Sequence, residues 1–163
     1  MCSDATRESS EAGCQSRVTN LGQTISAGPV PEAARGLLAA ANLPTSDLTD
    51  DQLTKFFYCG PAAAPLALIG LEIYGNDALL RSLVVDRTLR SAGLGSALVE
   101  YAEAHAANNN VGTLYLLTTT AEPFFARRGY HRVDRTVAPE AIRSTREFAG
   151  LCPASSAFMF KRL

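Results

Sequence analysis

The sequence predicts an α/β (α+β) domain in which helices flank a central mixed β-sheet. Two apolar segments of strand length, residues 66–74 and 78–85, are joined by the tight-turn sequence Gly75-Asn76-Asp77, which predicts an antiparallel hairpin. Residues 93–107 carry apolar side chains at helical spacing and precede another apolar segment at 113–119. This strand–helix–strand order predicts a crossover that places the later strand parallel to the hairpin.

Local signals predict the remaining elements. Residues 23–27 suit a first strand, and Pro31 suits the first turn of a helix over 32–41, which Pro44 ends. The sequence further predicts a capped helical segment within 45–53, strands at 55–59, 130–133 and 157–161, and helices at 121–128 and 138–149. Residues 1–22 are interpreted as a flexible or weakly structured segment, and 23–163 as the single folded domain.

Composition argues against several classes of protein. The 163 residues, 47% hydrophobic and 19% charged, fit one globular domain with a substantial core. A net charge of −1 and scattered basic residues give no indication of nucleic-acid binding. The sequence has no apolar run that could span a bilayer and no secretory signal, so we expect a cytoplasmic protein without a membrane partner. Cys2, Cys14, Cys59 and Cys152 form no C-x-x-C pair, so we expect no metal site.

A glycine-containing segment, Arg90-Ser91-Ala92-Gly93-Leu94-Gly95-Ser96, lies between the predicted hairpin and the following helix. Glycines one residue apart let a ligand approach the backbone, because no Cβ stands in the way. The free N–H groups and the dipole of the helix's first turn attract an anion there, and Arg90 adds a fixed positive charge. The segment therefore predicts a pyrophosphate cradle, and the alternative is an ordinary strand-to-helix corner.

The pattern Arg90-x-x-Gly93-x-Gly95, placed directly after a strand, resembles the acetyl-coenzyme A signature of the GCN5-related N-acetyltransferase (GNAT) family. A second block, from Leu116 through the Phe124-Phe125 pair to Tyr130, resembles a later block of the same family. The resemblance implies that two central strands splay apart into an acyl-coenzyme A cleft, with the pantetheine arm between them. The coenzyme contacts that it implies are Leu83, Val84, Val85, Arg90, Ser91, Ala92, Gly93, Leu94, Gly95, Ser96, Thr118 and Phe125.

The sequence departs from the common family pattern at Phe125. Many family members carry a tyrosine there, whose hydroxyl can protonate the departing thiolate, and phenylalanine has no such proton. Thr118 stands where the family usually has an asparagine at the strand end. Thr120, Tyr130 and Cys152 are the alternative proton donors that the sequence offers, and water is another.

The sequence also resembles the amino-acid N-acetyltransferase branch of the family. Through residues 141–155 it is more closely similar to small acetyltransferases encoded with arsenic-resistance genes. The resemblance implies metal-independent transfer from acetyl-coenzyme A to a small, amino-acid-like amine by direct attack, and it is compatible with a homodimer. Direct transfer makes Cys152 a structural thiol rather than a nucleophile. The alternative is a non-catalytic acyl-coenzyme A-binding or regulatory module, which Phe125 favours.

Glu72 is the first candidate for the base that accepts the amine proton, because a carboxylate in an apolar strand needs a role or a partner. The alternatives are a solvent-facing Glu72 or one paired with Arg81 across the hairpin. Arg81, with Ser82 beside it, and Arg143 are candidates for binding a substrate carboxylate in bidentate fashion. The alternative for Arg143 is a solvated helix face.

Overall fold

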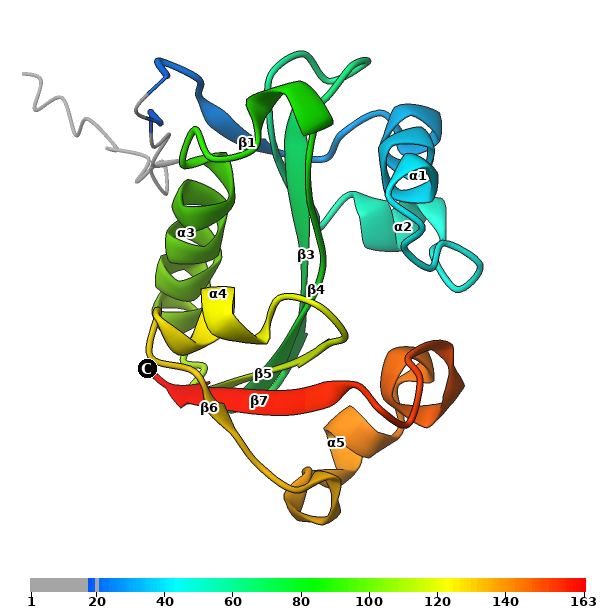
Figure 1. Cartoon of the computed structure of the whole chain (residues 1–163), viewed down its shortest axis with the longest axis vertical. Coiled ribbons are helices and arrows are strands. Elements are labelled where there is room, and N and C mark those ends of the chain that lie inside the picture. The colour runs from blue at the N-terminus through cyan, green and yellow to red at the C-terminus, as the bar shows by residue number, and fades with distance from the viewer. Residues whose placement is uncertain (1–17, 20) are drawn as a thin grey trace, which may run out of the picture.

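Figure 1 shows a computed structural model that describes residues 18–19 and 21–163. The predicted flexible segment 1–22 therefore lies mostly outside the described residues. Seven strands form one sheet in the order β1-β2-β3-β4-β5-β7-β6. The strands are β1 (Ile25–Ala27), β2 (Phe57–Cys59), β3 (Ala67–Tyr74), β4 (Asp77–Val85), β5 (Thr113–Thr118), β6 (His131–Arg132) and β7 (Ala157–Arg162). Every predicted strand is present, with bounds that differ by one or a few residues.

The sheet is mixed, as predicted. β3 and β4 form the antiparallel hairpin, and its turn contains Gly75 with a left-handed φ of 65°. β4 and β5 pair in parallel across the crossover helix α3 (Leu94–Asn108). The other strand pairs described are antiparallel. The parallel pair lies at the centre of the sheet, so the chain segment that links its two strands lies beside the centre of the molecule.

Helices cover both faces of the sheet (Figure 1). α3 packs against β3 and β4 on one face, and α1 (Pro31–Ala40) lies with α2 (Asp50–Leu53) on the opposite face. α1 has Pro31 at its start, as predicted. Before α2, the Thr49 side chain and the Gln52 side chain form a reciprocal capping box. Two short helices, α4 (Glu122–Ala126) and α5 (Glu140–Arg143), follow β5.

The single helix predicted over 138–149 is wrong. The structure has α5, then a break, then a π-helical turn at Glu147–Leu151. The buried Thr145 hydroxyl donates to the Ile142 carbonyl at 2.7 Å and accepts from the Phe148 N–H at 3.3 Å. Such local side-chain bonds compete with the regular helical pattern. As a result, Glu147 and the residues after it follow a different path from that of α5.

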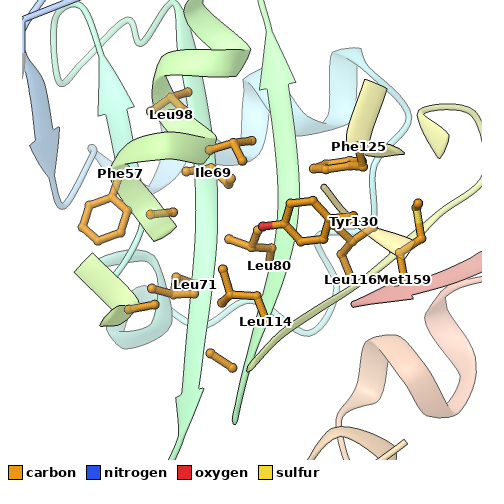
Figure 2. Close-up of a cluster of buried hydrophobic side chains, with 14 of the residues drawn as sticks. Phe57, Ile69, Leu71, Leu80, Leu98, Leu114, Leu116, Phe125, Tyr130 and Met159 are labelled. Carbon is orange, nitrogen blue, oxygen red and sulfur yellow. The ribbon is translucent and has the colours of Figure 1, made fainter. Parts of the chain in front are cut away.

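The main hydrophobic core lies between α3 and the centre of the sheet (Figure 2). Leu98 of α3 packs over side chains of β3, β4 and β5, and Leu80 and Leu116 extend this core to Phe125 and Tyr130. A second apolar cluster joins α1 and α2 to the other face of the sheet. Each face of the sheet is therefore covered, which fixes both long strands of the hairpin in place.

A buried ion pair joins the loop before α2 to the sheet. The Arg81 guanidinium on β4 donates to the two carboxylate oxygens of Asp47 at 2.5 and 3.0 Å. The side chains are 1% and 3% exposed, respectively. Burial removes water as a competing partner, so each charge depends on the other.

Replacing Asp47 by asparagine should therefore destabilise the fold. The substitution weakens charge-assisted hydrogen bonds worth about 1.5–3 kcal/mol, while Glu72 and Glu147 still compensate the Arg81 charge, so the loss should be about 1–3 kcal/mol. Urea denaturation measures the change in the free energy of unfolding. The matched control is Asp50→Asn, because the Asp50 side chain is 74% exposed. Losing its surface ion pair with Arg35 should lower the free energy of unfolding by less than about 1 kcal/mol. Equal small losses in both variants would contradict a structural role for the Arg81–Asp47 pair.

Gly70 on β3 should not tolerate a side chain. A Cβ at this position would lie 2.5 Å from Cζ of the buried Phe56 ring and 2.9 Å from Cγ of Arg81. Gly70→Ala should lower the free energy of unfolding by about 1–3 kcal/mol through overpacking. Gly36→Ala is the control, because a Cβ there meets no atom within 4 Å and alanine favours the helix. Thermal denaturation of both variants checks the prediction, and a Gly70→Ala protein as stable as the parent would contradict it.

Candidate functional site

The parallel pairing of β4 and β5 stops partway along both strands. It runs from Asp77 opposite Thr113 to Leu80 opposite Leu116. Beyond Leu116, β5 stays paired with β7, while β4 stays paired with β3 as far as Val85. The two strands separate in Figure 1, as the family resemblance implied. The edge of β4 that faces β5 therefore keeps backbone groups without a strand partner beyond Leu80.

A bulge in the hairpin accompanies this separation. The register between β3 and β4 shifts between Leu68 and Gly70, and Ser82 has a left-handed φ of 57°. A bulge bends its strand and increases the local twist. The bend directs β4 away from β5 where Leu83 and Val84 follow. Ser82 is buried, and its hydroxyl accepts a hydrogen bond from Nε of Arg81 at 3.2 Å.

A cavity of about 400 Å³, which we call the central cleft, lies where the strands separate. Its lining combines apolar side chains with a few polar groups. The lining includes Leu80, Arg81, Thr118, Phe125, Glu147 and Cys152. An apolar cavity with a small number of polar groups is the usual form of a small-molecule site.

A second cavity of about 650 Å³, which we call the cradle cavity, lies at the start of α3. Gly93 is the N-terminal cap of α3 with a left-handed φ of 84°, a conformation that suits glycine. Leu94, Gly95 and Ser96, in the first turn of this 15-residue helix, line the cavity, and the helix dipole makes the site attractive to an anion. Leu83, Thr120 and Ala121 line both cavities, so the cradle cavity and the central cleft adjoin.

Most of the residues predicted for coenzyme binding lie along these two cavities. The cradle cavity is lined by Leu83, Val84, Val85, Arg90, Ser91, Gly93, Leu94, Gly95 and Ser96. Thr118 and Phe125 line the central cleft, whereas Ala92 lines neither cavity. The structure thus brings together two sequence blocks that lie about thirty residues apart.

Two arginines of the cradle cavity were missed by sequence reasoning. Arg127 and Arg128 both line it, together with Arg90. The Arg128 guanidinium stacks on the Phe124 ring at 3.5 Å from the centroid and donates to the Phe124 carbonyl at 2.7 Å and to the Ser96 hydroxyl. These contacts hold a positive charge over the start of α3. The adjacent arginines after the Phe124-Phe125 pair were the signal that could have identified them.

The predicted substrate-binding and catalytic residues fall in different places. Arg81 and Ser82 line the central cleft. Glu72 lines a neighbouring polar cavity, where its carboxylate accepts from Arg81 at 3.0 Å and from the Tyr74 hydroxyl at 2.6 Å. The cross-hairpin pairing of Glu72 with Arg81 was one of the alternatives drawn from the sequence. Arg143 is exposed, lines neither cavity and donates to the Thr136 carbonyl at 2.5 Å.

A third carboxylate, Glu147, faces Arg81 from the π-helical turn. Its Oε2 lies 3.6 Å from Nε of Arg81, too far for a hydrogen bond, and this buried oxygen has no hydrogen-bond partner. Burial raises the pKa of Glu147 to about 7, with contributions from the charges of Glu72 and Asp47, while Arg81 and the Cys152 thiol oppose this shift. Sequence reasoning missed both Asp47 and Glu147.

The structure also locates the three side chains that could replace the absent tyrosine. Tyr130 is 1% exposed and donates its hydroxyl to Glu103 at 3.0 Å, and it does not line the central cleft. Burial raises the pKa of the Cys152 thiol to about 12, as does the charge of Glu147, which makes this thiol a weak acid. Thr120 lines the cleft and is exposed. No tyrosine of the described residues lines the central cleft.

The part of the chain that the structure describes has neither a cluster of metal-binding side chains nor a helix suited to cross a membrane. Over residues 18–19 and 21–163, no group of three or more His, Cys, Asp or Glu side chains is placed to hold a metal ion. In the same residues, none of the helices combines the length and apolar character that a bilayer crossing requires.

Solved structures share this fold. N-acetylglutamate synthase from Neisseria gonorrhoeae, determined with coenzyme A and L-arginine, superposes with a TM-score of 0.73 at 16% identity over 86% of this chain. The present chain corresponds to 33% of that enzyme's length. A Mycobacterium tuberculosis protein solved with coenzyme A gives a TM-score of 0.68 at 16% identity, covering 85% of this chain and 98% of that one. A GNAT acetyltransferase from Staphylococcus aureus gives 0.68 at 17% identity, covering 86% and 99%.

Sequence comparison identifies the family. An N-acetyltransferase of uncharacterised function from Chlorobaculum tepidum is 37% identical over 63 residues, which are 39% of this chain and 40% of that protein. The model of the acetyltransferase (GNAT) domain matches residues 45–146, more than half of the chain. This match includes the hairpin, the cradle and the β5–α4 block described above. The chain therefore belongs to the GNAT acetyltransferase family.

Proposed function

We propose that the protein transfers an acetyl group from acetyl-coenzyme A to the amine of a small, amino-acid-like molecule. The observation that carries this proposal is the continuity of the cradle cavity with the central cleft at the point where β4 and β5 separate. A long ligand with an anionic end and a reactive acyl end fits such a pair of cavities. Its phosphates would lie at the start of α3, and its thioester would lie in the central cleft.

The chain offers matching partners for the phosphates and for the pantetheine arm of the coenzyme. The N–H groups after Gly93 and the guanidinium groups of Arg90 and Arg128 suit phosphate oxygens. The backbone of Leu83 and Val84, on the unpaired edge of β4, suits the amides of the pantetheine arm. The amine nitrogen then attacks the thioester carbonyl carbon, a C–N bond forms, and the C–S bond breaks. The departing thiolate takes up one proton, which balances one of the protons that the amine loses.

The charge around the central cleft favours a protonated amine as the acceptor. Arg81 is surrounded by three carboxylates, those of Asp47, Glu72 and Glu147. With all four groups ionised, the cluster has a formal charge of +1 − 3 = −2. A carboxylate of this cluster, Glu72 in the prediction from sequence, serves as the acceptor of the amine proton. The fold shared with N-acetylglutamate synthase supports an amino-acid-like substrate, and the sequence resemblance extends the candidates to arsenical amino acids.

A second candidate function is a non-catalytic acyl-coenzyme A-binding module. The specific observation that favours it is the absence of a tyrosine hydroxyl from the central cleft among the described residues. Phe125 occupies the family position, and Tyr130 is bonded to Glu103. Both candidates require the cradle, but only the enzyme releases coenzyme A when an amine is added.

The cradle gives a direct test of coenzyme binding. Gly95→Val should weaken coenzyme A binding about 10²-fold or more, because the added methyl groups obstruct charge-assisted hydrogen bonds worth about 1.5–3 kcal/mol each. Arg90→Ala should weaken it less, since Arg90 is exposed and its charge is screened. Isothermal titration calorimetry measures both affinities. A Cβ at Gly95 would have ordinary contacts at 3.6 Å with Phe124 and Val85, so the variant should still fold, and circular dichroism checks this. A folded Gly95→Val protein that binds as tightly as the parent would remove the cradle assignment.

Matched pairs of amino acids and their decarboxylated amines test the acceptor. If Arg81 or Arg143 binds a substrate carboxylate, kcat/KM should be higher for the amino acid by about 10²-fold or more, because a charge-assisted bidentate contact is lost with the amine. A thiol-release assay with acetyl-coenzyme A measures the rates, and arsenical amino acids belong in the panel. If Arg143 is the contact, Arg143→Ala should abolish the preference for the amino acid, whereas the control Arg162→Ala, an exposed arginine that lines none of these cavities, should retain it. Equal rates on both members of every pair would eliminate carboxylate recognition.

A further inference from the structure

The three carboxylates around Arg81 differ in how well their charge is compensated. Asp47 accepts two hydrogen bonds from the guanidinium, and Glu72 accepts one from Arg81 and one from Tyr74. Glu147 receives a 3.6 Å approach from Nε, whose hydrogen bond goes to Ser82, and a hydrogen bond from the neutral Cys152 thiol, while its Oε2 has no hydrogen-bond partner. One guanidinium cannot neutralise the two buried carboxylates of Asp47 and Glu147 together with the partly buried carboxylate of Glu72. The charge on Glu147 is therefore the least stabilised of the three.

The carboxylates also differ in where they lie. Asp47 and Glu72 line the neighbouring polar cavity, and Arg81 lines both that cavity and the central cleft. Glu147 is the one acidic side chain, among the described residues, that lines the central cleft. It shares this cleft with Thr118 and Phe125, at the separation of β4 and β5. An amine positioned to attack a thioester there would meet Glu147 before it met Glu72.

The π-helical turn explains how Glu147 is presented to the cleft. The Cys152 N–H donates to the Glu147 carbonyl at 3.1 Å, which closes a wider turn than an α-helix would. Glu147, Leu151 and Cys152 consequently line the same cavity. Wide turns of this kind are frequent at functional sites. The Glu147 side chain is nevertheless only 7% exposed, so water hydrates its unpartnered oxygen poorly.

We infer that Glu147, rather than Glu72, is the proton acceptor for the incoming amine, a role that rests on the acetyltransferase function proposed above. One proton passes from the ammonium nitrogen to the Glu147 carboxylate, and the neutral amine then attacks the thioester carbonyl carbon. After the C–S bond breaks, the former amine nitrogen loses its second proton and the thiolate takes up one proton. These two transfers cancel, so the reaction releases one net proton, the one that Glu147 accepted. Glu147 returns its proton to solvent through the open cleft, so the carboxylate is regenerated for the next cycle.

The titration of Glu147 suits this role. A base that works near neutral pH needs a pKa near 7, and burial raises the pKa of Glu147 to about 7. The groups that face it are Arg81 on β4, Glu72 on β3, Asp47 in the loop before α2, and the Cys152 thiol, with Arg135 near that thiol. Because the pKa is raised, the carboxylate form is lost as the pH falls through about 7, and activity should fall with it.

The test compares Glu147→Gln with its matched control Glu72→Gln in the full-length protein. In Glu147→Gln, kcat/KM for the amine should fall by about 10²–10⁴, and the ionisation near pH 7 should disappear from the pH–rate profile. Glu72→Gln should lower kcat/KM by less than about tenfold and retain that ionisation, shifted to lower pH because the Glu72 charge helps to raise the pKa of Glu147. Calorimetry should show that both variants bind coenzyme A as the parent does. A Glu147→Gln enzyme that keeps the neutral-pH ionisation would overturn the inference and leave the proposed function standing.

A measurement independent of turnover completes the test. Carbon-13 NMR of the side-chain carboxyl groups should show one glutamate that titrates near pH 7 in the parent and is absent from Glu147→Gln. If no carboxyl group of the parent protein titrates above about pH 6, Glu147 is not the proton acceptor, whatever the kinetics show. A parent that binds coenzyme A but acetylates no amine in the panel would overturn the proposed function itself, and the role of Glu147 with it.

Discussion

The early end of the hydrogen bonding between β4 and β5 is the constraint on which the site depends. Parallel strands normally keep their pairing, since an unpaired buried backbone group costs free energy. Here the pairing ends at Leu80 and Leu116, while β3 and β7 hold the two strands on their outer sides. The opening between the strands is therefore rigid rather than frayed. A ligand that carries its own amide groups can satisfy the exposed edge of β4, and the adjoining cradle can bind its anionic end.

The buried guanidinium of Arg81 imposes a second constraint. Burial opposes its charge, but hydrogen bonding to Asp47 and the charges of Glu147 and Glu72 raise its pKa, so it stays cationic. It must therefore attract carboxylates from three parts of the chain that are distant in sequence. This attraction fixes the loop before α2 and the π-helical turn against the hairpin. The same excess of carboxylates leaves Glu147 incompletely compensated, so one cluster both stabilises the site and supplies a titratable group to the cleft.

Sequence reasoning identified the parts of the fold around this site that depend on local signals. The hairpin turn at Gly75, the start of α1 at Pro31 and the start of α3 after Gly93 all depend on residues adjacent in the chain, and each was placed correctly. Asp47 and Glu147 were missed, because their importance appears only when the fold brings them to Arg81, 34 and 66 positions away. The helix predicted over 138–149 failed because a propensity pattern does not register the hydrogen bonds of the Thr145 hydroxyl.

The phenylalanine at position 125 also has a structural explanation. Its ring is buried against Phe124 and Tyr130 in edge-to-face contacts, at centroid distances of 5.0 and 5.5 Å, which a wholly apolar ring suits. The chemical consequence is modest, because a thiol has an ordinary pKa of about 8.5 and its thiolate therefore leaves readily near neutral pH. An amine with a pKa of about 8 to 10 is mostly protonated at that pH and cannot attack. Removing a proton from the amine is thus the harder requirement, and the cleft meets it with the buried carboxylate of Glu147, although no tyrosine of the described residues lines it.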